Sequence, residues 1–86
     1  MIKKPVTIQL QSGLETRPAA LLVQVASQYK SEVYLEVGNQ KRVNAKSIMG
    51  MMSLKLTEGT NLVVVAEGED EEMAVKGVEA FLSSSH

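Results

Sequence analysis

The chain lacks cysteine and has very few histidine and aromatic residues. Its 86 residues include no cysteine or tryptophan, one histidine, two tyrosines and one phenylalanine. The absence of cysteine excludes disulfides and thiolate metal sites and fits a reducing compartment such as the cytoplasm. The histidine is the terminal residue His86, so neither a histidine-based triad nor an imidazole metal site is expected. We therefore expect no enzymatic activity, no metal and no cofactor.

A strong positive charge and long hydrophobic runs are also missing. Nine Lys and Arg residues are balanced by ten Asp and Glu residues, giving a formal net charge of −1 at pH 7. Direct binding of DNA or RNA is not expected, because both a basic field and a set of stacking aromatic rings are absent. The first ten residues, MIKKPVTIQL, lack the apolar core of a signal peptide, and no run reaches membrane-spanning length. These absences predict a cytoplasmic protein that does not enter a membrane.

The remaining composition is that of an ordinary globular domain. The chain is 44% hydrophobic and 22% charged, which is typical of a folded protein of this size. We expect one domain over residues 1–86, with a frayed polar tail at 83–86.

Alternating apolar residues predict four strands. Pro5, which lacks a backbone donor, places the first strand at a sheet edge. The Gly38-Asn39 pair predicts a hairpin turn between the second strand and a short third strand over Lys41 to Val43. The period-two apolar positions of the other strands are Val6, Ile8 and Leu10, then Val33, Leu35 and Val37, then Leu62, Val64 and Ala66.

Helical spacing predicts three helices between and after these strands. Thr16 can cap the first, Ser47 the second and Asp70 the third. The buried positions predicted for the first helix are Ala19, Leu22, Val23 and Ala26, and those for the third are Ala74, Val78 and Phe81. The element order is β-α-β-β-α-β-α, which predicts an α+β fold of the split-βαβ kind with helices on one face of the sheet and an open face on the other.

The stretch NAKSIMGMMSL, residues Asn44 to Leu54, contains more large apolar side chains than a short helix can bury on one side. Some of its methionines are therefore expected to face water. A phosphate on Ser47 would meet the positive end of the helix dipole and would be tolerated there. The physics alone also allows a simpler interpretation, in which a capped short helix uses methionine as core filler.

Residues before the first helix form a second polar group. Ser12, Gly13, Thr16 and Arg17 bring hydroxyls, backbone donors and a guanidinium together, as an anion site would. Glu15 lies among them, and its carboxylate would neutralise part of that positive potential. Both interpretations remain open from the residues alone.

The segments SGLETRPAA, from Ser12, and VNAKSIMGMMSL, from Val43, resemble the HPr family of small phosphocarrier proteins of the bacterial sugar phosphotransferase system. The resemblance covers essentially the whole chain and implies an HPr-like open-faced β-sandwich with a four-stranded antiparallel sheet and three helices on one face. The family's phosphorylated histidine corresponds to Glu15 here. The Crh subgroup, named for catabolite repression HPr, also lacks this histidine and has an acidic stretch similar to Gly68 to Glu71.

The resemblance implies a regulatory phosphoprotein rather than a carrier. Ser47 is then the site that HPr kinase/phosphorylase modifies, and the product is a corepressor for the catabolite control protein, a LacI-type transcription regulator, in carbon catabolite repression. Position 15 cannot carry a histidine phosphate. The resemblance assigns partner binding to Arg17, Ala20, Ile48, Met49 and Met52. With Ser12 and Thr16 of the possible anion site, these are the expected anion- or partner-binding residues.

Two other functions and one assembly are kept as alternatives. The chain could be an HPr phosphocarrier, natural or mutated at Glu15, or a split-βαβ module that senses a ligand. On the open face, Val63, Val65 and Tyr34 are expected to form an exposed apolar patch. Exchange of the edge strand, Val6 to Leu10, would give a homodimer.

Overall fold

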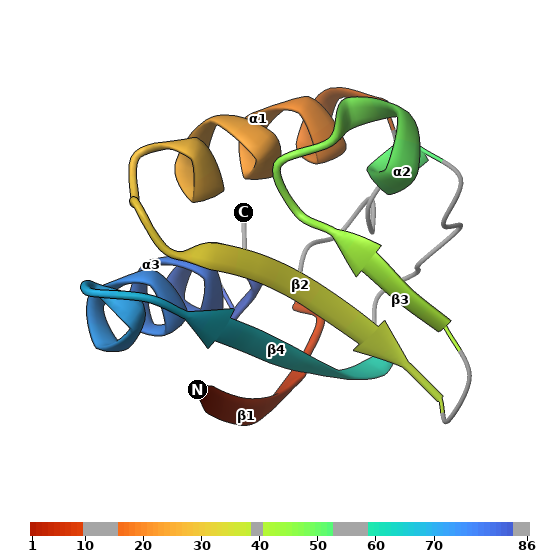
Figure 1. The fold of residues 1–86 in the computed structure, drawn as a ribbon. Coiled ribbons are helices and arrows are strands. Elements are labelled where there is room, and N and C mark those ends of the chain that lie inside the picture. Colours follow the sequence, from red (N-terminus) through yellow and green to blue (C-terminus); the bar gives the residue numbers. More distant parts are fainter. Residues whose placement is uncertain (10–15, 39–40, 53–58, 84–86) are drawn as a thin grey trace.

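The computed structural model describes residues 1–9, 16–38, 41–52 and 59–83. Its elements follow the order β-α-β-β-α-β-α (Figure 1), as the sequence predicts. They are β1 (Ile2–Thr7), α1 (Thr16–Ser27), β2 (Glu32–Val37), β3 (Lys41–Asn44), α2 (Ile48–Met52), β4 (Asn61–Glu67) and α3 (Glu71–Ser83). No helix among these residues is long and apolar enough to cross a membrane.

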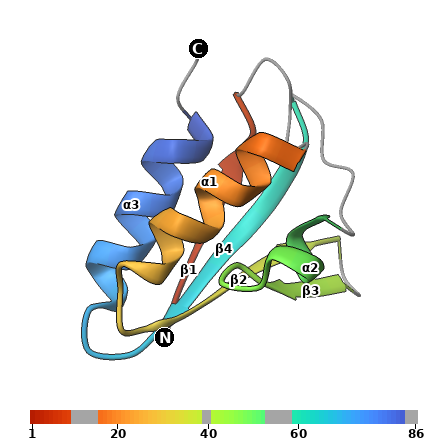
Figure 2. The same ribbon diagram turned by 90° about the horizontal axis from the view of Figure 1, so that it is seen from above.

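The four strands form one antiparallel sheet in the order β1-β4-β2-β3. The last strand in the sequence, β4, therefore lies in the interior of the sheet, between β1 and β2. In this register Val64 lies opposite Lys4 of β1 and Leu35 of β2. The three helices cover one face of the sheet, and α1 packs against both α2 and α3 (Figure 2).

The core lies between this face and the helices. Leu62, Val64 and Ala66 of β4 are buried there, as predicted. In α1 the predicted positions Ala19, Leu22 and Ala26 are fully buried, and Val23 packs partly against them. In α3 the buried residues are Ala74, Val75, Val78 and Leu82.

The buried side of α3 differs from the prediction at one residue. Phe81 is only partly buried, and the neighbouring Leu82 has no exposed surface. Val75, which was not predicted, is also buried. The buried stripe of α3, which packs against β1, β4 and α1, is therefore turned relative to the predicted one.

The first strand begins earlier than the sequence predicts. Its range is Ile2–Thr7, so Ile8 is a core residue just beyond its end, and Leu10 lies outside the described residues. The alternation of apolar and polar residues does not reveal the first half of this strand, because a charged residue, Lys4, occupies a position that faces the helices. Its ammonium group reaches Glu79 of α3, 3.0 Å away, as long cationic side chains do when their stems cross apolar surface. The edge position predicted from Pro5 is confirmed.

The exposed apolar patch predicted for the open face is wrong at Val65, whereas Val63 and Tyr34 are partly exposed. Val65 does belong to the face opposite the main core, yet only 1% of its surface is exposed. In the register it lies between Lys3 and Tyr34. The guanidinium of Arg42 lies 5.1 Å from the Tyr34 ring centroid. Long polar side chains therefore shield this face.

An ion pair fixes the position of Arg42 on this face. Its guanidinium donates hydrogen bonds to Glu36, the shorter one 2.6 Å long. The same carboxylate lies 4.0 Å from the ammonium group of Lys3. The hydrogen bond from Arg42, helped by the charge of Lys3, lowers the pKa of Glu36.

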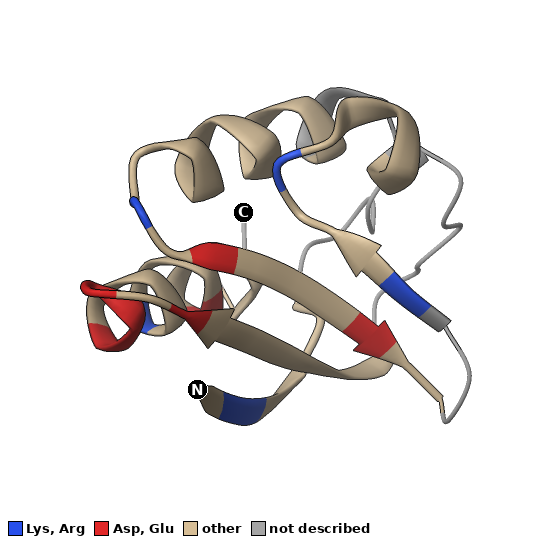
Figure 3. Ribbon diagram, in the orientation of Figure 1, with Lys and Arg blue, Asp and Glu red and all other residues tan. Residues whose placement is uncertain are grey.

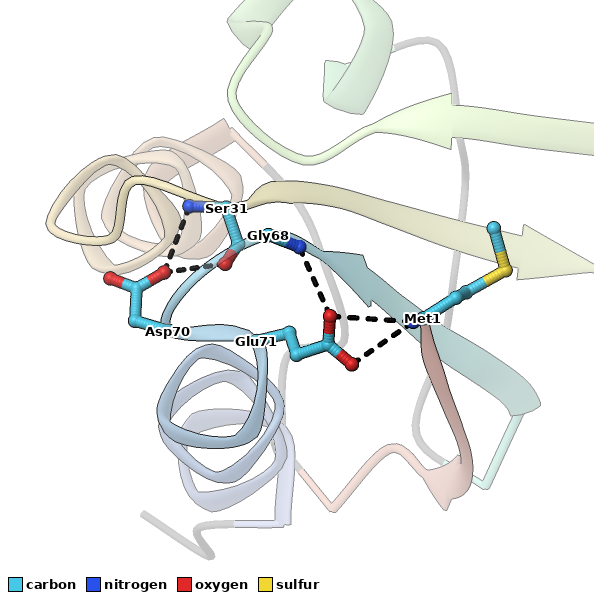
Figure 4. A network of polar contacts seen from close by, with 5 residues as sticks. All are labelled: Met1, Ser31, Gly68, Asp70 and Glu71. Carbon is cyan, nitrogen blue, oxygen red and sulfur yellow. Dashed lines mark hydrogen bonds and ion pairs between the residues drawn. The ribbon is translucent and has the colours of Figure 1, made fainter.

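A carboxylate clasp joins the start of β2 to the start of α3. The side chain of Asp70 accepts hydrogen bonds from the Ser31 N–H, at 2.9 Å, and from the Ser31 hydroxyl (Figure 4). It also accepts a hydrogen bond from the Lys30 N–H at 2.9 Å. Ser31 is 2% exposed, so these bonds satisfy buried donors. Asp70 does precede the first residue of α3, and its carbonyl accepts from the Ala74 N–H. Its carboxylate, however, binds the segment just before β2.

Gly68 allows the two segments to approach this closely. Its φ is +150°, and a Cβ at this position would lie 2.7 Å from the Cα of Ser31. A larger residue would therefore push β2 away from the turn before α3. The Gly68 N–H donates to Glu71, whose carboxylate also binds the amino group of Met1 at 3.0 Å.

Candidate functional site

Ser47 caps α2, as the sequence predicts. Its Oγ accepts a hydrogen bond from the Gly50 N–H at 3.2 Å, and its carbonyl accepts from the Met51 N–H at 2.9 Å. These are the contacts of an N-cap residue. The segment before it is also held, because the Asn44 side chain accepts from the Lys46 N–H at 2.8 Å. The Ser47 hydroxyl therefore has a defined place, and its side chain is half-buried.

The apolar residues of α2 divide between the surface and the core. Met49 is 78% exposed and Ile48 is 38% exposed, whereas Met51 has no exposed surface. The prediction that part of this helix faces water is confirmed. Met51 fills the core, as the simpler interpretation held for the methionines in general. The side chain of Met52 lies outside the described part of the chain.

Gly50 lets α2 lie close to the sheet. A Cβ at this position would come within 3.0 Å of Val43 Cγ1. The helix is in contact with β3 and α1. These contacts fix the position of α2 on the domain.

Lys46 connects this segment to the loop after α1. Its ammonium group donates to the carbonyl of Tyr29 at 2.7 Å. The next two residues of that loop, Lys30 and Ser31, are those bound by Asp70. The segment before Ser47 and the start of α3 are therefore both anchored to one loop.

Only part of the predicted anion site can be located. Ser12, Gly13 and Glu15 lie outside the described residues. Thr16 and Arg17 form the first two positions of α1, and their side chains lie outside the described part. Ala20 is partly exposed on α1, and α1 packs against α2.

Leu21 is a surface residue that the sequence analysis missed. It is 42% exposed, and it follows Arg17 by about one helical turn along α1. The helical spacing of the sequence could have indicated this exposure. Leu21 falls outside the spacing of Ala19, Leu22 and Ala26, so it is an apolar residue that the buried stripe does not use.

Acidic residues gather in a stretch at the start of α3 (Figure 3), and they differ in their environments. Hydrogen bonds from Ser31 and Lys30 lower the pKa of Asp70 to about 2, and bonding to the Gly68 N–H and the chain's amino group lowers the pKa of Glu71. Glu69 and Glu72 are exposed. Half of this stretch therefore has a structural role. Within the described ranges, no group of three acidic or histidine side chains could hold a metal ion.

The family model described as the PTS HPr component phosphorylation site matches residues 2–84. HPr-like protein Crh of Bacillus subtilis strain 168 is 46% identical over 82 residues, which cover 95% of each chain. Two crystal structures are also similar. One is the phosphocarrier protein HPr of Bacillus anthracis strain Ames, with a TM-score of 0.89, 41% identity, and coverage of 94% of this chain and 95% of that one.

The second crystal structure is that of Bacillus subtilis Crh, with a TM-score of 0.78, 44% identity, and coverage of 100% of this chain and 98% of that one. That protein is described as a domain-swapped, intertwined dimer. Sequence and fold thus agree over nearly the full length. The chain belongs to the HPr family of phosphocarrier and regulatory proteins, and within that family it is similar to the Crh subgroup.

Proposed function

We propose that this chain is a Crh-type regulatory protein of the cytoplasm and not an enzyme. HPr kinase/phosphorylase phosphorylates Ser47, and the product binds the catabolite control protein as its corepressor in carbon catabolite repression. The observation that carries the proposal is the placement of Ser47. Its hydroxyl caps α2 immediately before two exposed apolar side chains, Ile48 and Met49.

The surroundings of Ser47 favour a phosphate that is read by a partner. A phosphate adds up to about two negative charges and three acceptor oxygens. Beside it, Ile48 and Met49 offer apolar contact area. We propose that Ala20 and Leu21 of α1, which packs against α2, extend this area. We call the surface of Ser47, Ile48, Met49, Ala20 and Leu21 the Ser47 face. Arg17, Thr16, Ser12 and Met52 are proposed to join it.

The direct test is incubation with HPr kinase/phosphorylase and ATP, followed by phosphopeptide mapping. We expect a single phosphate on Ser47. Titration of the product against the catabolite control protein should show binding that the unmodified chain lacks. Phosphate on another residue, or equal binding by both forms, would refute the proposal.

Glu15 is proposed to end the carrier activity. A histidine nitrogen accepts a phosphoryl group reversibly, whereas a glutamyl phosphate hydrolyses readily. Incubation with phosphoenolpyruvate and the general phosphotransferase enzyme should therefore leave the mass of this chain unchanged. Glu15→His should regain part of the acceptance, which serves as the positive control.

The competing function is that of an HPr phosphocarrier, with Glu15 natural or introduced by mutation. Its support is the similarity to Bacillus anthracis HPr over nearly the whole chain. Acid-labile phosphate on the unmutated protein, passed on to a sugar permease component, would establish it.

We also propose that the chain forms a homodimer through exchange of β1. This strand lies at a sheet edge, where an identical strand can replace it at low cost, and a relative forms a swapped dimer. Sedimentation velocity across a wide concentration range should show two species. A monomer alone at every concentration would contradict the exchange.

A further inference from the structure

The sulfur chemistry of this chain is limited to methionine. It has five methionines and no cysteine. A peroxide therefore meets no thiol, and its attack is directed to the thioethers. In this reaction the peroxide transfers one oxygen atom to sulfur. The sulfur loses two electrons and becomes a sulfoxide, while the rest of the peroxide leaves as water.

Exposure divides the described methionine side chains into two classes. Met49, Met73 and Met1 are 78%, 65% and 60% exposed, whereas Met51 has no exposed surface. A peroxide can reach the first three in the folded protein. It reaches Met51 only when the structure opens locally, so the sulfur of Met51 should react at least about tenfold more slowly.

Position distinguishes Met49 from the other exposed sulfurs. It follows Ser47 by two residues in α2, which is in contact with α1 and β3. Met73 lies in the first turn of α3, and the amino group of Met1 is bound to Glu71 of the same helix. Among the described residues, Met49 is thus the accessible sulfur of the Ser47 face.

We propose that Met49 is a peroxide-modified site whose sulfoxide weakens partner binding by the Ser47 face. The inference rests on the proposed function and adds a second input to the same surface. Phosphorylation supplies charge that promotes binding. Oxidation replaces apolar contact with a polar group that must lose its water when the partner covers it. The two modifications therefore oppose each other.

The free protein should tolerate this change, because Met49 contributes little to the core. Its 78% exposure means that the sulfoxide oxygen remains hydrated in the unbound state. Oxidation of Met51 would instead place a polar group among buried side chains. The melting temperature therefore separates a surface effect from damage to the fold.

The experiment uses the phosphorylated full-length chain and dilute hydrogen peroxide. Peptide mapping over time should show Met49, Met73 and Met1 oxidised before Met51. The affinity for the catabolite control protein, measured by calorimetry, should fall about tenfold at an unchanged melting temperature. Treatment with methionine sulfoxide reductases should restore it.

Two matched variants assign the effect to one sulfur. Met49→Leu keeps an apolar side chain but cannot form a sulfoxide. Its affinity before peroxide treatment sets its own baseline, and peroxide should leave that affinity unchanged although Met73 and Met1 are oxidised. Met73→Leu should lose affinity as the unmutated chain does. An equal loss in Met49→Leu would assign the effect to another residue, Met52 included, and overturn the inference.

The two proposals fail in different ways. If the phosphorylated, unoxidised chain does not bind, the proposed function fails, and the effect of oxidation on binding fails with it. If that chain binds and oxidised Met49 leaves its affinity unchanged, the function stands and the inference is wrong. Equal oxidation rates for Met49 and Met51 would also overturn it.

Discussion

Ser47→Ala should abolish the proposed kinase-dependent binding to the catabolite control protein while the domain still folds. The variant cannot carry the phosphate, which supplies one to three charge-assisted hydrogen bonds to a partner, so affinity should fall roughly 100-fold or more relative to the phosphorylated chain. The loss of the cap bond to Gly50 costs about 1 kcal/mol. Calorimetric titration after kinase treatment, together with thermal melting, measures both effects.

A second variant separates charge from capping at Ser47, and a third serves as a control. Ser47→Asp keeps a capping oxygen and one negative charge but lacks the three phosphate oxygens, so it should restore stability more completely than binding. Ser27→Ala changes an exposed serine at the end of α1 and should leave phosphorylation unchanged. Full binding by kinase-treated Ser47→Ala would show that the switch lies elsewhere.

Asp70→Asn should be strongly destabilising for so small a change in shape. The carboxylate accepts hydrogen bonds from the Ser31 N–H and hydroxyl and from the Lys30 N–H. An amide offers one oxygen and directs its NH₂ group toward these donors, leaving buried groups of Ser31 poorly satisfied. We expect the melting temperature to fall by roughly 5–15 °C. Glu72→Gln, at an exposed position of α3, should change it little.

The effect of Asp70 on stability should depend on pH. Hydrogen bonding lowers its pKa from 3.8 to about 2 in the folded protein. A carboxyl group with a lowered folded pKa stabilises the fold fully above its unfolded pKa and loses this contribution as the pH falls through the folded pKa. The difference in melting temperature between the unmutated chain and Asp70→Asn should therefore narrow from about pH 4 to pH 2.

The acidic residues present in both proteins do not obscure this comparison. The pKa values of Glu36 and Glu71 are also lowered. Both groups are present in the unmutated chain and in Asp70→Asn, so each protein loses the same contribution from them as the pH falls. The difference between the curves reports position 70. A difference that stays constant down to pH 2 would mean that the Asp70 carboxylate is not the source of the stabilisation.

Local patterns predict much of this fold because they act over a few residues. The seven elements, their order, the edge position of β1 and the cap at Ser47 all follow from periodicity, proline and capping. These signals are repeated along the chain and agree with one another. The resemblance to the HPr family gives the same architecture independently.

Contacts between distant residues could not be predicted in the same way. Asp70 and Ser31 are 39 residues apart in sequence, and Asp70 looks like an ordinary helix cap. Lys4 interrupts the apolar alternation although it faces the helices, because its ion pair with Glu79 forms only in the folded chain. Val65 looks exposed because the shielding residues come from other strands.

At the candidate site too, local patterns predict some features, while others depend on contacts between distant residues. Exposure of Met49 was expected from crowding in a short helix, and burial of Met51 required knowledge of its packing against the core. Helical spacing indicates the exposure of Leu21 only by exclusion, because that spacing identifies the buried stripe of α1 and not the apolar residues outside it. The assignments of Glu15, Ser12 and Met52 remain predictions based on the family resemblance.

The sheet order has a consequence for synthesis on the ribosome. β1 ends at Thr7, yet its pairing partner β4 begins only at Asn61. At translation rates of roughly 5–20 residues per second, the first strand waits about 3–11 s for its partner to be made. Two lysines and a proline, Lys3, Lys4 and Pro5, are the gatekeepers that keep the nascent strand hydrated during this interval. The residues that later lie at a sheet edge would thus first keep an unpaired strand from aggregating with the nascent chains on adjacent ribosomes of the same messenger RNA.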